Sequence, residues 1–534
     1  MATFDVIIKG ATLVDGTGAS GRPADLGVRR DRVVAIGDLS AASAADVVEA
    51  RGHVVCPGFI DVHTHSDLTP LMDSRCASKV RQGVTTELVG NCGFSAFPLL
   101  KGTAQERVEL DRAVMMASGV EADWSDCAGY LAALERAEPA FNMATQVGNG
   151  TIRSAVMGYD NRPPTADELR AMRRLVAGAM EQGAFGLSTG LTLHPSSLAQ
   201  TGEVVALCKE VARWGGLYNT HTRHLAGWHF KSVEEAIEIG RRAGVAVEVA
   251  HLCVLDPRYW GQAERLLKII EDAQANGVDV TFDAYPYTAA GCPFSEAMPD
   301  WVQDGGTEAM LRRLGDPAVR RRVLAEADTS WCGGIPVHWD KVFIAWGGPY
   351  GHAAWTGKTV AALAAEKGVS AAEMMLDILI QSRDVGLMIV HNRLEEDVER
   401  FISHRLGSIG SDGIAIAADG PWGGSPVHPR FYGAFPRVLA RFVRERQALS
   451  LEEAIRKMTS LTADRLGLKD RGRLEEGYAA DLVLFDPATV QDRATFEDSH
   501  QYPAGISHVM VNGQWVVCDG EQTQARPGRV LRHK

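Results

Sequence analysis

Short strand-like runs that alternate with helices fill the middle of this 534-residue chain, and they limit its fold more than any other feature. Nine runs qualify: 58–63, 85–92, 141–149, 184–190, 216–221, 246–251, 278–285, 387–391 and 408–412. Such alternation is typical of a parallel sheet in which each strand is followed by a helix. We predict an α/β fold, a (β/α)8 TIM barrel that occupies residues 58–469.

A TIM barrel has room for only eight of these nine runs. We expect the run "LMIVH" at 387–391 to lie outside the barrel. The stretch 286–345 is rich in Pro, Gly and Trp and matches no strand–helix unit. We interpret 286–345 as an insertion whose expected place is over the barrel mouth, because long irregular segments in compact domains are commonly functional.

The two ends of the chain resemble each other and differ from the middle. Residues 1–57 and 470–534 contain short apolar runs separated by Gly and Asp, and Asn512-Gly513 stands between two such runs. Asn-Gly between apolar runs is a strong hairpin signal. We predict that both termini together form one small β domain, a β-sandwich.

Helix starts are marked by the capping-box pattern, in which Ser or Thr is followed three residues later by Glu. Four stretches fit it: Thr165–Glu168, Ser232–Glu235, Ser370–Glu373 and Ser450–Glu453. These are structural signals and carry no chemistry.

The composition narrows the classes of partner. A formal net charge of −12 argues against a nucleic acid or an anionic membrane, since both favour a basic surface. The start "MATFDVIIKG" has no basic segment followed by an apolar core, and no apolar run reaches transmembrane length, so we expect a cytoplasmic protein. The expected partner is a small molecule, and homo-oligomerisation is left open.

Several strand candidates end in a residue that can bind a metal ion or move a proton. They are His63 and His65 in "DVHTH", Cys92 in "GNC", His221 in "NTH", His251 in "VAH" and Asp412 in "GSD". His63 and His65 are two apart, so in a strand both would point to the same side. One such residue alone is more often a satisfied structural group. Six of them in barrel order indicate a single site, because the carboxyl ends of barrel strands meet at one mouth.

Thiolate and imidazole ligands favour Zn²⁺. Cys92, His221 and His251 would make a tight three-ligand site with an open position, and His63 and His65 could hold a second, weaker ion with the thiolate shared. An open zinc position lowers the pKa of a bound water to about 7. Asp412 is then the expected catalytic acid/base, which takes a proton from that water and passes it to a leaving nitrogen.

With these residues in place, the chain resembles the amidohydrolase superfamily, and within it the D-aminoacylases (N-acyl-D-amino-acid deacylases). The matching stretches include "PGFIDVHTHSD", "GVTTELVGNCG", "GAFGLSTG", "NTHTR", "FDAYPY", "GSDG", "HPRFYGAFPRVL" and "GYAADLVLFDP", and they span nearly the whole chain. The resemblance implies a zinc-bearing barrel with a small β domain. It also implies that Cys92, His221 and His251 are tight ligands, that His63 and His65 form a weaker site, and that Asp412 is catalytic.

The same resemblance implies substrate contacts. Arg430 in "HPRFYG" matches an arginine that grips the substrate carboxylate, and Tyr285 in "DAYPY" matches a tyrosine that helps it. Other substrate positions depart from the family pattern. Cys253 stands where a lysine is usual, Leu193 lies where a pocket tyrosine is expected, and His224 follows "THTR" where the family tends to be acidic.

Three functional hypotheses follow. The first is zinc-dependent hydrolysis of a C–N amide bond, most simply the deacylation of N-acyl-D-amino acids. The second keeps this chemistry on a bulkier or less anionic amide: a larger N-acyl compound, a cyclic amide or a xenobiotic. The third is a non-catalytic relative that kept the barrel for binding, for which we would expect eroded metal ligands; all six positions are intact.

Overall fold

Parallel strand segments close into a barrel in the computed structural model, which describes residues 4–99, 120–223, 229–327, 334–348, 350–424 and 426–534. Its strands are β6 (Phe59–Asp61), β7 (Val84–Val89), β8 (Asn142–Thr145) with β9 (Val147–Gly148), β10 (Gly186–Gly190), β11 (Leu217–His221), β12 (Ala246–Val249), β13 (Val280–Ala284) and β17 (Gly407–Ile409). Neighbours pair in this order, and all these pairs are parallel.

The barrel closes between its first and last strands. Asp412 N donates to His63 O at 2.8 Å, and His65 N donates to Gly413 O at 2.8 Å. Strand ends that are about 350 positions apart in sequence therefore share hydrogen bonds. The prediction of a TIM barrel is confirmed.

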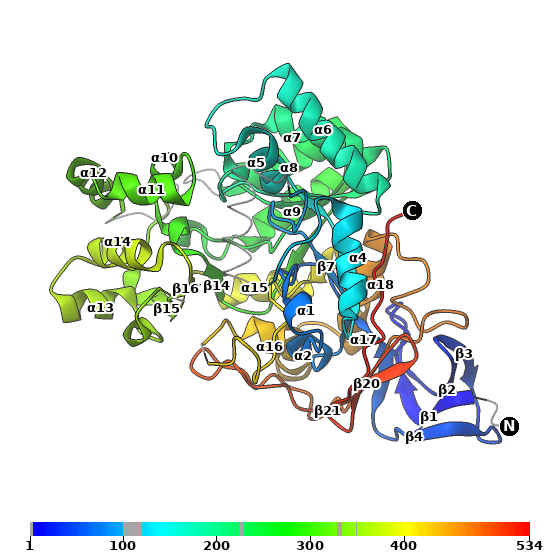
Figure 1. Cartoon of the computed structure of the whole chain (residues 1–534). Helices are drawn as coiled ribbons and strands as arrows, with labels where there is room; N and C mark the ends of the chain where they lie inside the picture. Colours follow the sequence, from blue (N-terminus) through cyan, green and yellow to red (C-terminus); the bar gives the residue numbers. More distant parts are fainter. Residues whose placement is uncertain (1–3, 100–119, 224–228, 328–333, 349, 425) are drawn as a thin grey trace.

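Helices surround the barrel and cover its strands (Figure 1). They are α1 (Thr69–Met72), α2 (Ala77–Val80), α4 (Cys127–Ala137), α5 (Asn149–Met157), α6 (Ala166–Glu181), α7 (Thr201–Ala212), α8 (His229–Ala243), α9 (Ala263–Ala275), α15 (Glu395–Ser403), α16 (Arg430–Arg437), α17 (Leu451–Met458) and α18 (Ser460–Arg465). Their apolar faces and the outer faces of the strands form the main core. Among the described residues, no helix is long and apolar enough to cross a membrane.

The predicted helix starts are right in three of four cases. Full capping boxes begin α6 and α14 (Ala371–Ser382), and Ser450 caps α17 by accepting from Glu453 N. The Ser232–Glu235 prediction is wrong, because α8 already runs from His229 and Ser232 Oγ donates to His229 O inside it. The Ser-x-x-Glu pattern can thus also occur inside a helix. Its spacing alone does not distinguish such an internal position from a helix start.

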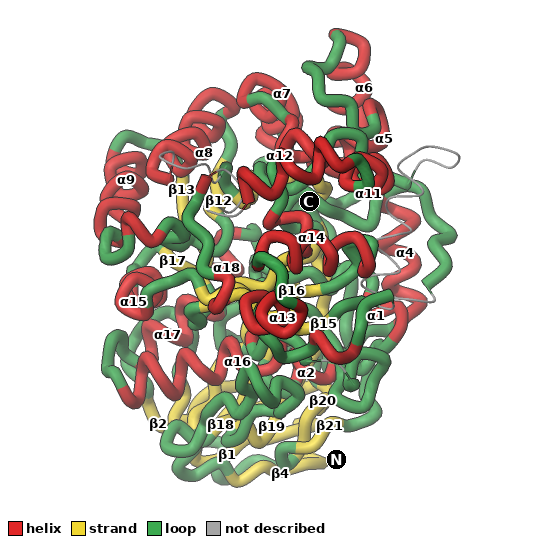
Figure 2. Tube along the Cα trace, turned by 90° about the vertical axis from the view of Figure 1, so that its left-hand side faces the viewer, coloured by secondary structure: helices red, strands yellow, loops and turns green. Residues whose placement is uncertain are grey.

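A separate layer between β13 and α15 projects from the barrel. Its strands β14 (Ala289–Cys292), β15 (Val342–Trp346) and β16 (Leu387–His391) form an antiparallel sheet, so "LMIVH" lies outside the barrel as predicted. Its helices are α10 (Asp300–Gln303), α11 (Thr307–Leu314), α12 (Pro317–Ala327), α13 (Val360–Lys367) and α14 (Ala371–Ser382). The layer has its own apolar core and continues past 345, the end expected from composition, to β16. Figure 2 shows α13, α14 and β16 in front of the barrel.

Both chain ends meet in one small β domain. It contains β1 (Phe4–Leu13), β2 (Arg22–Arg29), β3 (Arg32–Gly37), β4 (Ala44–Glu49), β5 (Val54–Pro57), β18 (Leu482–Phe485), β19 (Ile506–Val511), β20 (Gln514–Cys518) and β21 (Glu521–Gln522). The expected sandwich takes the form of one nine-stranded sheet around its own apolar core, in which β5 pairs with β18. Asn512 and Gly513 form the predicted hairpin turn between β19 and β20, both with positive φ (46° and 82°).

Candidate metal centre and active site

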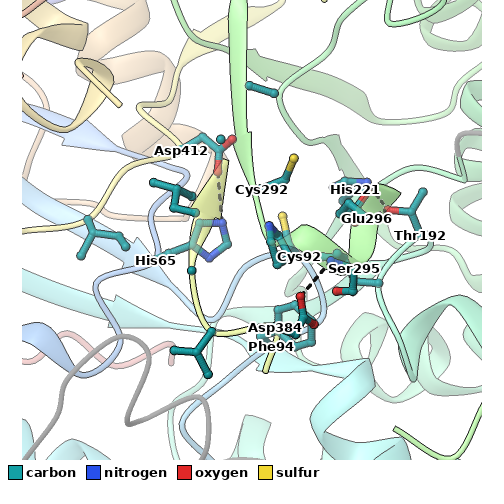
Figure 3. Close-up of a pocket in the computed structure, with 18 of the residues that line it drawn as sticks. His65, Cys92, Phe94, Thr192, His221, Cys292, Ser295, Glu296, Asp384 and Asp412 are labelled. Carbon is teal, nitrogen blue, oxygen red and sulfur yellow. Dashed lines mark hydrogen bonds and ion pairs between the residues drawn. The ribbon is translucent and has the colours of Figure 1, made fainter. Parts of the chain in front are cut away.

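Four barrel segments bring a thiol and four imidazoles together at the barrel mouth. Cys92 Sγ lies 3.4 Å from His63 Nε2 and 3.5 Å from His251 Nε2. The ligand atoms of Cys92, His221 and His251 all lie within 4.8 Å of one another, and so do those of His63, His65 and Cys92. Cys92 is therefore common to two groups that could each hold a metal ion, as the sequence predicts. In Figure 3, His65, Cys92 and His221 surround the same cavity.

The depth of each imidazole differs. His63 has no exposed surface, while His65 is half-buried and lines the cavity.

His63 Nδ1 hydrogen-bonds Asp283 Oδ2 at 3.1 Å, and Asp283 Oδ1 accepts from His251 N at 2.9 Å. Asp283 therefore directs the Nε2 atom of His63 toward Cys92 and holds the backbone of His251, which is the usual role of a carboxylate behind metal-binding histidines.

Left-handed backbone marks three of these strand ends. Cys92, His251 and Asp412 have φ values of 52°, 35° and 50°, a region that residues other than glycine rarely occupy. Strain of this kind persists only where surrounding structure enforces it, and it gathers at functional sites. Here it turns each side chain from the end of its strand into the mouth.

Close packing explains the glycine of "VGNCG". Gly90 has φ 82°, and a Cβ added there would lie 2.2 Å from Gln146 O on the neighbouring segment. Only glycine fits at this point. The turn that follows then carries Asn91 and Cys92 into the mouth.

The electrostatics of the cluster favour a thiolate. Burial alone would raise the pKa of Cys92, but the charge of His63 and hydrogen bonds from His221, His251 and His63 hold it well below the usual thiol value. Burial likewise opposes the charged form of His65, but hydrogen bonds to Asp412 and Cys92 raise its pKa to about 9. In the absence of a metal ion, charged histidines thus stabilise the thiolate. A bound divalent cation can supply this positive charge in their place, with the imidazoles neutral.

This donor set fits zinc. One thiolate with two imidazoles matches the ligands of known Zn²⁺ sites, and a zinc ion held by these three residues would keep a fourth position for water or substrate. No residue is missing from the predicted set, and the ligand atoms already converge. The second group, His63 and His65 with the same thiolate, likewise offers one sulfur and two nitrogen ligands.

Asp412 lies between the imidazoles and a guanidinium. Its Oδ1 is 3.1 Å from His65 Nε2 and 3.7 Å from His63 Nε2, and its Oδ2 is 3.0 Å from Arg430 Nη1. Burial would raise the pKa of this carboxyl, but Arg430, a hydrogen bond from His65 and the nearby histidines hold it well below the usual range. Asp412 is therefore ionised and can accept a proton.

The predicted substrate residues lie around one cavity of about 1050 Å³. Leu193, Cys253, Tyr285 and Arg430 all line it, together with His65, Cys92, His221, His251 and Asp412. Arg430 is paired with Asp412 rather than standing alone in the cavity. The remaining prediction, His224, lies outside the described residues.

Two residues at the site were missed by sequence reasoning. Thr192 Oγ1 hydrogen-bonds His221 Nε2 at 2.8 Å and donates to Glu296 Oε1 at 3.2 Å (Figure 3). Glu296 belongs to the projecting layer, so this contact ties that layer to the metal cluster. A Thr beside a strand end gives no distinct signal, and Glu296 sits in a segment that we interpreted only as an insertion.

A buried lysine beneath the mouth was also missed. Lys79 Nζ donates to Asp61 Oδ2 at 2.8 Å and to Ser411 Oγ at 2.6 Å, and it lies 3.1 Å from Glu87 Oε1. Asp61 Oδ1 in turn accepts from Ser411 N at 2.9 Å. These contacts lock β6 to the end of β17 and so fix the residue before Asp412.

The fold and the cluster together define a class: a (β/α)8 barrel of the metal-dependent hydrolase type, with its site at the carboxyl ends of the strands. The model of the amidohydrolase family matches residues 46–517. The chain is 39% identical to D-aminoacylase from Alcaligenes xylosoxydans xylosoxydans over 530 residues, which cover 99% of this chain and 97% of that protein. The chain belongs to the amidohydrolase family, and the predicted resemblance is confirmed.

Solved structures agree over the whole chain. N-acyl-D-glutamate deacylase from Bordetella bronchiseptica, in complex with zinc and a phosphonate mimic of the tetrahedral intermediate, has a TM-score of 0.82 at 34% identity and 99% coverage of both chains. A D-aminoacylase structure, described as having a binuclear metal centre with one-metal activation and second-metal attenuation, has a TM-score of 0.83 at 37% identity and covers 99% of this chain and 100% of that one.

Proposed function

We propose that this protein is a zinc-dependent deacylase of N-acyl-D-amino acids. The observation that carries the proposal is the convergence of Cys92, His221 and His251 within 4.8 Å beside the ionised Asp412. Relatives that are 36–39% identical over the full chain are D-aminoacylase and the deacylases of N-acyl-D-glutamate and N-acyl-D-aspartate. The proposed partner is this small amide, and the net charge of −12 argues against a nucleic acid or an anionic membrane.

Cys92, His221 and His251 are proposed as the tight zinc ligands, and His63 and His65 as a weaker second site that shares the thiolate. The binuclear centre described for the D-aminoacylase structure supports two sites of unequal role. Zinc, when bound, polarises the acyl carbonyl and makes water nucleophilic at neutral pH.

Asp412 performs the proton transfers. Its Oδ1 faces the imidazoles, whereas Oδ2 is occupied by Arg430, so Oδ1 is the atom that accepts the proton of the attacking water. The same atom then donates this proton to the nitrogen of the departing amino acid. Arg430 holds the carboxylate in one orientation through both transfers and, by its charge, keeps it ionised between turnovers.

A substrate panel tests the proposal. The zinc-loaded protein is assayed with N-acetyl-D-amino acids, their L-enantiomers and carboxylate-free anilides of the same acyl group. We expect kcat/KM for the best D-compound to exceed that of its L-enantiomer and of the anilides by at least about 100-fold, as sites built on polar contacts discriminate steeply. Faster hydrolysis of the anilides, or no turnover of any D-compound, would contradict the proposal.

A second candidate is the same chemistry on a bulkier amide. The size and lining of the cavity favour it: about 1050 Å³ is at the upper end for small-ligand pockets, and Leu193, Trp346 and Trp422 are among the apolar side chains on its wall. Acyl groups of increasing length in the same panel distinguish the two, since only the second candidate predicts that kcat/KM rises with chain length.

A further inference from the structure

Arg393 is a cavity-lining cation that no motif indicated. It follows β16, and its backbone N donates to Thr288 O at 3.1 Å, which ties the returning end of the projecting layer to the segment after β13. The side chain lines the same cavity as Cys253, Tyr285 and Asp412. The projecting layer therefore delivers an arginine to the barrel mouth.

The guanidinium of Arg393 is packed against Tyr285. Its Cζ lies 4.5 Å from the centre of the tyrosine ring, and the Cζ of Arg430 lies 4.9 Å from the same ring. Cys253 is hydrogen-bonded to Arg393. The planar group is thus oriented by an aromatic ring and by the sulfur of Cys253.

Arg393 also differs from Arg430 in its charge partners. Arg430 is paired with Asp412 at 3.0 Å, whereas the described part of the chain offers Arg393 no ion pair. Of the three acidic residues that follow it, Glu395 pairs with Arg441 at 2.6 Å, Asp397 accepts from Gly261 N and Ala263 N, and Glu396 is exposed to solvent. Two guanidinium charges thus face one carboxylate.

The histidine beside Tyr285 does not change this balance of charge. His428, beside Tyr285, has a pKa held well below its usual value by burial and by Arg430. It is neutral, and its ring nitrogens are used by Ala289 O and Arg430 N. One positive charge therefore remains in excess on this wall of the cavity.

Buried hydrogen-bond donors on this wall of the cavity also indicate a ligand. Arg393 Nη1 and Tyr285 Oη are both buried and have no hydrogen-bond partner among the described residues. Nε and Nη1 of Arg430 also have no hydrogen-bond partner there, but Nη1 lies within ion-pair distance of Asp412. A buried donor without a partner is costly, so such groups in a cavity indicate a ligand that completes them. Two neighbouring donors, one of them charged, suit the two oxygens of a carboxylate.

We propose that Arg393 binds the carboxylate of the substrate, with the Tyr285 hydroxyl as second donor, and that it is the main determinant of the preference for anionic amides. This inference rests on the proposed function, since it names the part of an N-acyl amino acid that the site recognises. The family resemblance leads one to expect a lysine at the position of Cys253. In this chain the cation comes instead from Arg393 on the projecting layer, which is distant from Cys253 in sequence. Arg430 remains the partner of Asp412.

Arg393→Met tests the proposal, because it removes the charge and keeps the length of the side chain. The zinc-loaded variant is assayed with an N-acyl-D-amino acid and with the corresponding amino-acid carboxamide. We expect KM for the acid to rise about 100-fold while kcat/KM for the carboxamide stays within about threefold of wild type. Arg393→Lys, which keeps the charge, is expected to recover part of the loss. Arg383→Met is the matched control, since Arg383 lines the same cavity but already pairs with Glu308.

Calorimetric binding of the product D-amino acid and of its carboxamide makes the test independent of turnover. We expect wild type to bind the acid at least about tenfold more tightly and Arg393→Met to lose this difference. Equal losses for acid and carboxamide, or an unchanged preference in the variant, overturn the inference while the deacylase function stands. If wild type hydrolyses no N-acyl-D-amino acid yet binds the acid through Arg393, the proposed function fails and the carboxylate site is supported.

Discussion

Arg430 Nη1 lies 3.0 Å from Asp412 Oδ2, and this contact joins the first residue of α16 to the end of the last barrel strand. Both side chains are almost fully buried. A buried carboxylate is ionised only where a partner compensates for lost solvation, and here the partner also fixes which oxygen faces the imidazoles. The pair therefore sets both the charge and the direction of the proposed acid/base.

Asp412→Asn removes the proton acceptor and keeps the shape of the side chain. We expect kcat to fall at least about 1000-fold, since proton transfer by a positioned group contributes 100- to 10,000-fold. Zinc content, measured by atomic absorption, should be unchanged. The control is Asp419→Asn, an exposed carboxylate paired with Arg75. Near-normal turnover in zinc-loaded Asp412→Asn would refute the role of Asp412.

Cys92→Ser tests whether the Cys92 thiolate is a tight zinc ligand. The hydroxyl is a far poorer zinc ligand than a thiolate, so we expect the zinc Kd to rise by at least about 100-fold in competition with a chelator. Cys292→Ser is the matched control, because Cys292 also lines the cavity but its pKa is raised well above the usual value by burial, which keeps it a thiol. If both variants retain zinc equally, the thiolate is not a tight ligand.

How much of this site the sequence predicts depends on the kind of residue. His63, Cys92, His251 and Asp412 each end a strand run, and barrel geometry requires such ends to meet, so the cluster follows from local pattern. Counting strands shows that one of the nine runs must lie outside the barrel, but the count alone does not identify it as 387–391. These inferences need only period-two alternation and the number of strands that close a barrel.

Other features depend on contacts between distant segments, which no local pattern records. Arg393 and Glu296 reach the mouth from the projecting layer, whose path the sequence leaves undefined. Lys79 lies in a four-residue helix and looks like a surface lysine until its partners are known. The role of Arg430 beside Asp412 likewise requires the register of α16 against β17.

Lys79→Met tests the buried network beneath the mouth. Lys79, Asp61 and Glu87 are all fully buried, so removal of the cation leaves two carboxylates without compensation. We expect the free energy of unfolding in urea at neutral pH to fall by about 3–5 kcal/mol. Lys268→Met, which breaks an exposed pair with Asp272, should have no measurable effect. A change at Lys79 as small as that at Lys268 would show that the network does not stabilise the fold.

Glu248 gives the stability a specific pH dependence. Burial, opposed by Arg465, raises its pKa from 4.5 to about 7; Asp283 adds to the increase. The folded protein therefore holds a proton on Glu248 between about pH 4.5 and 7, where the unfolded chain has lost it. This contribution to stability is largest below about pH 4.5 and is lost as the pH rises to 7.

Glu248→Gln cannot ionise, and its amide replaces the protonated acid beside Thr281 and Ser408. We expect the variant and wild type to be similar in unfolding free energy at pH 5, and the variant to become more stable by up to about 3 kcal/mol at pH 8, at 1.4 kcal/mol per pKa unit. Urea unfolding at constant free zinc measures the difference at each pH, and exposed Glu264→Gln is the control. Parallel curves for wild type and Glu248→Gln from pH 5 to 8 would mean that Glu248 is ionised throughout this range.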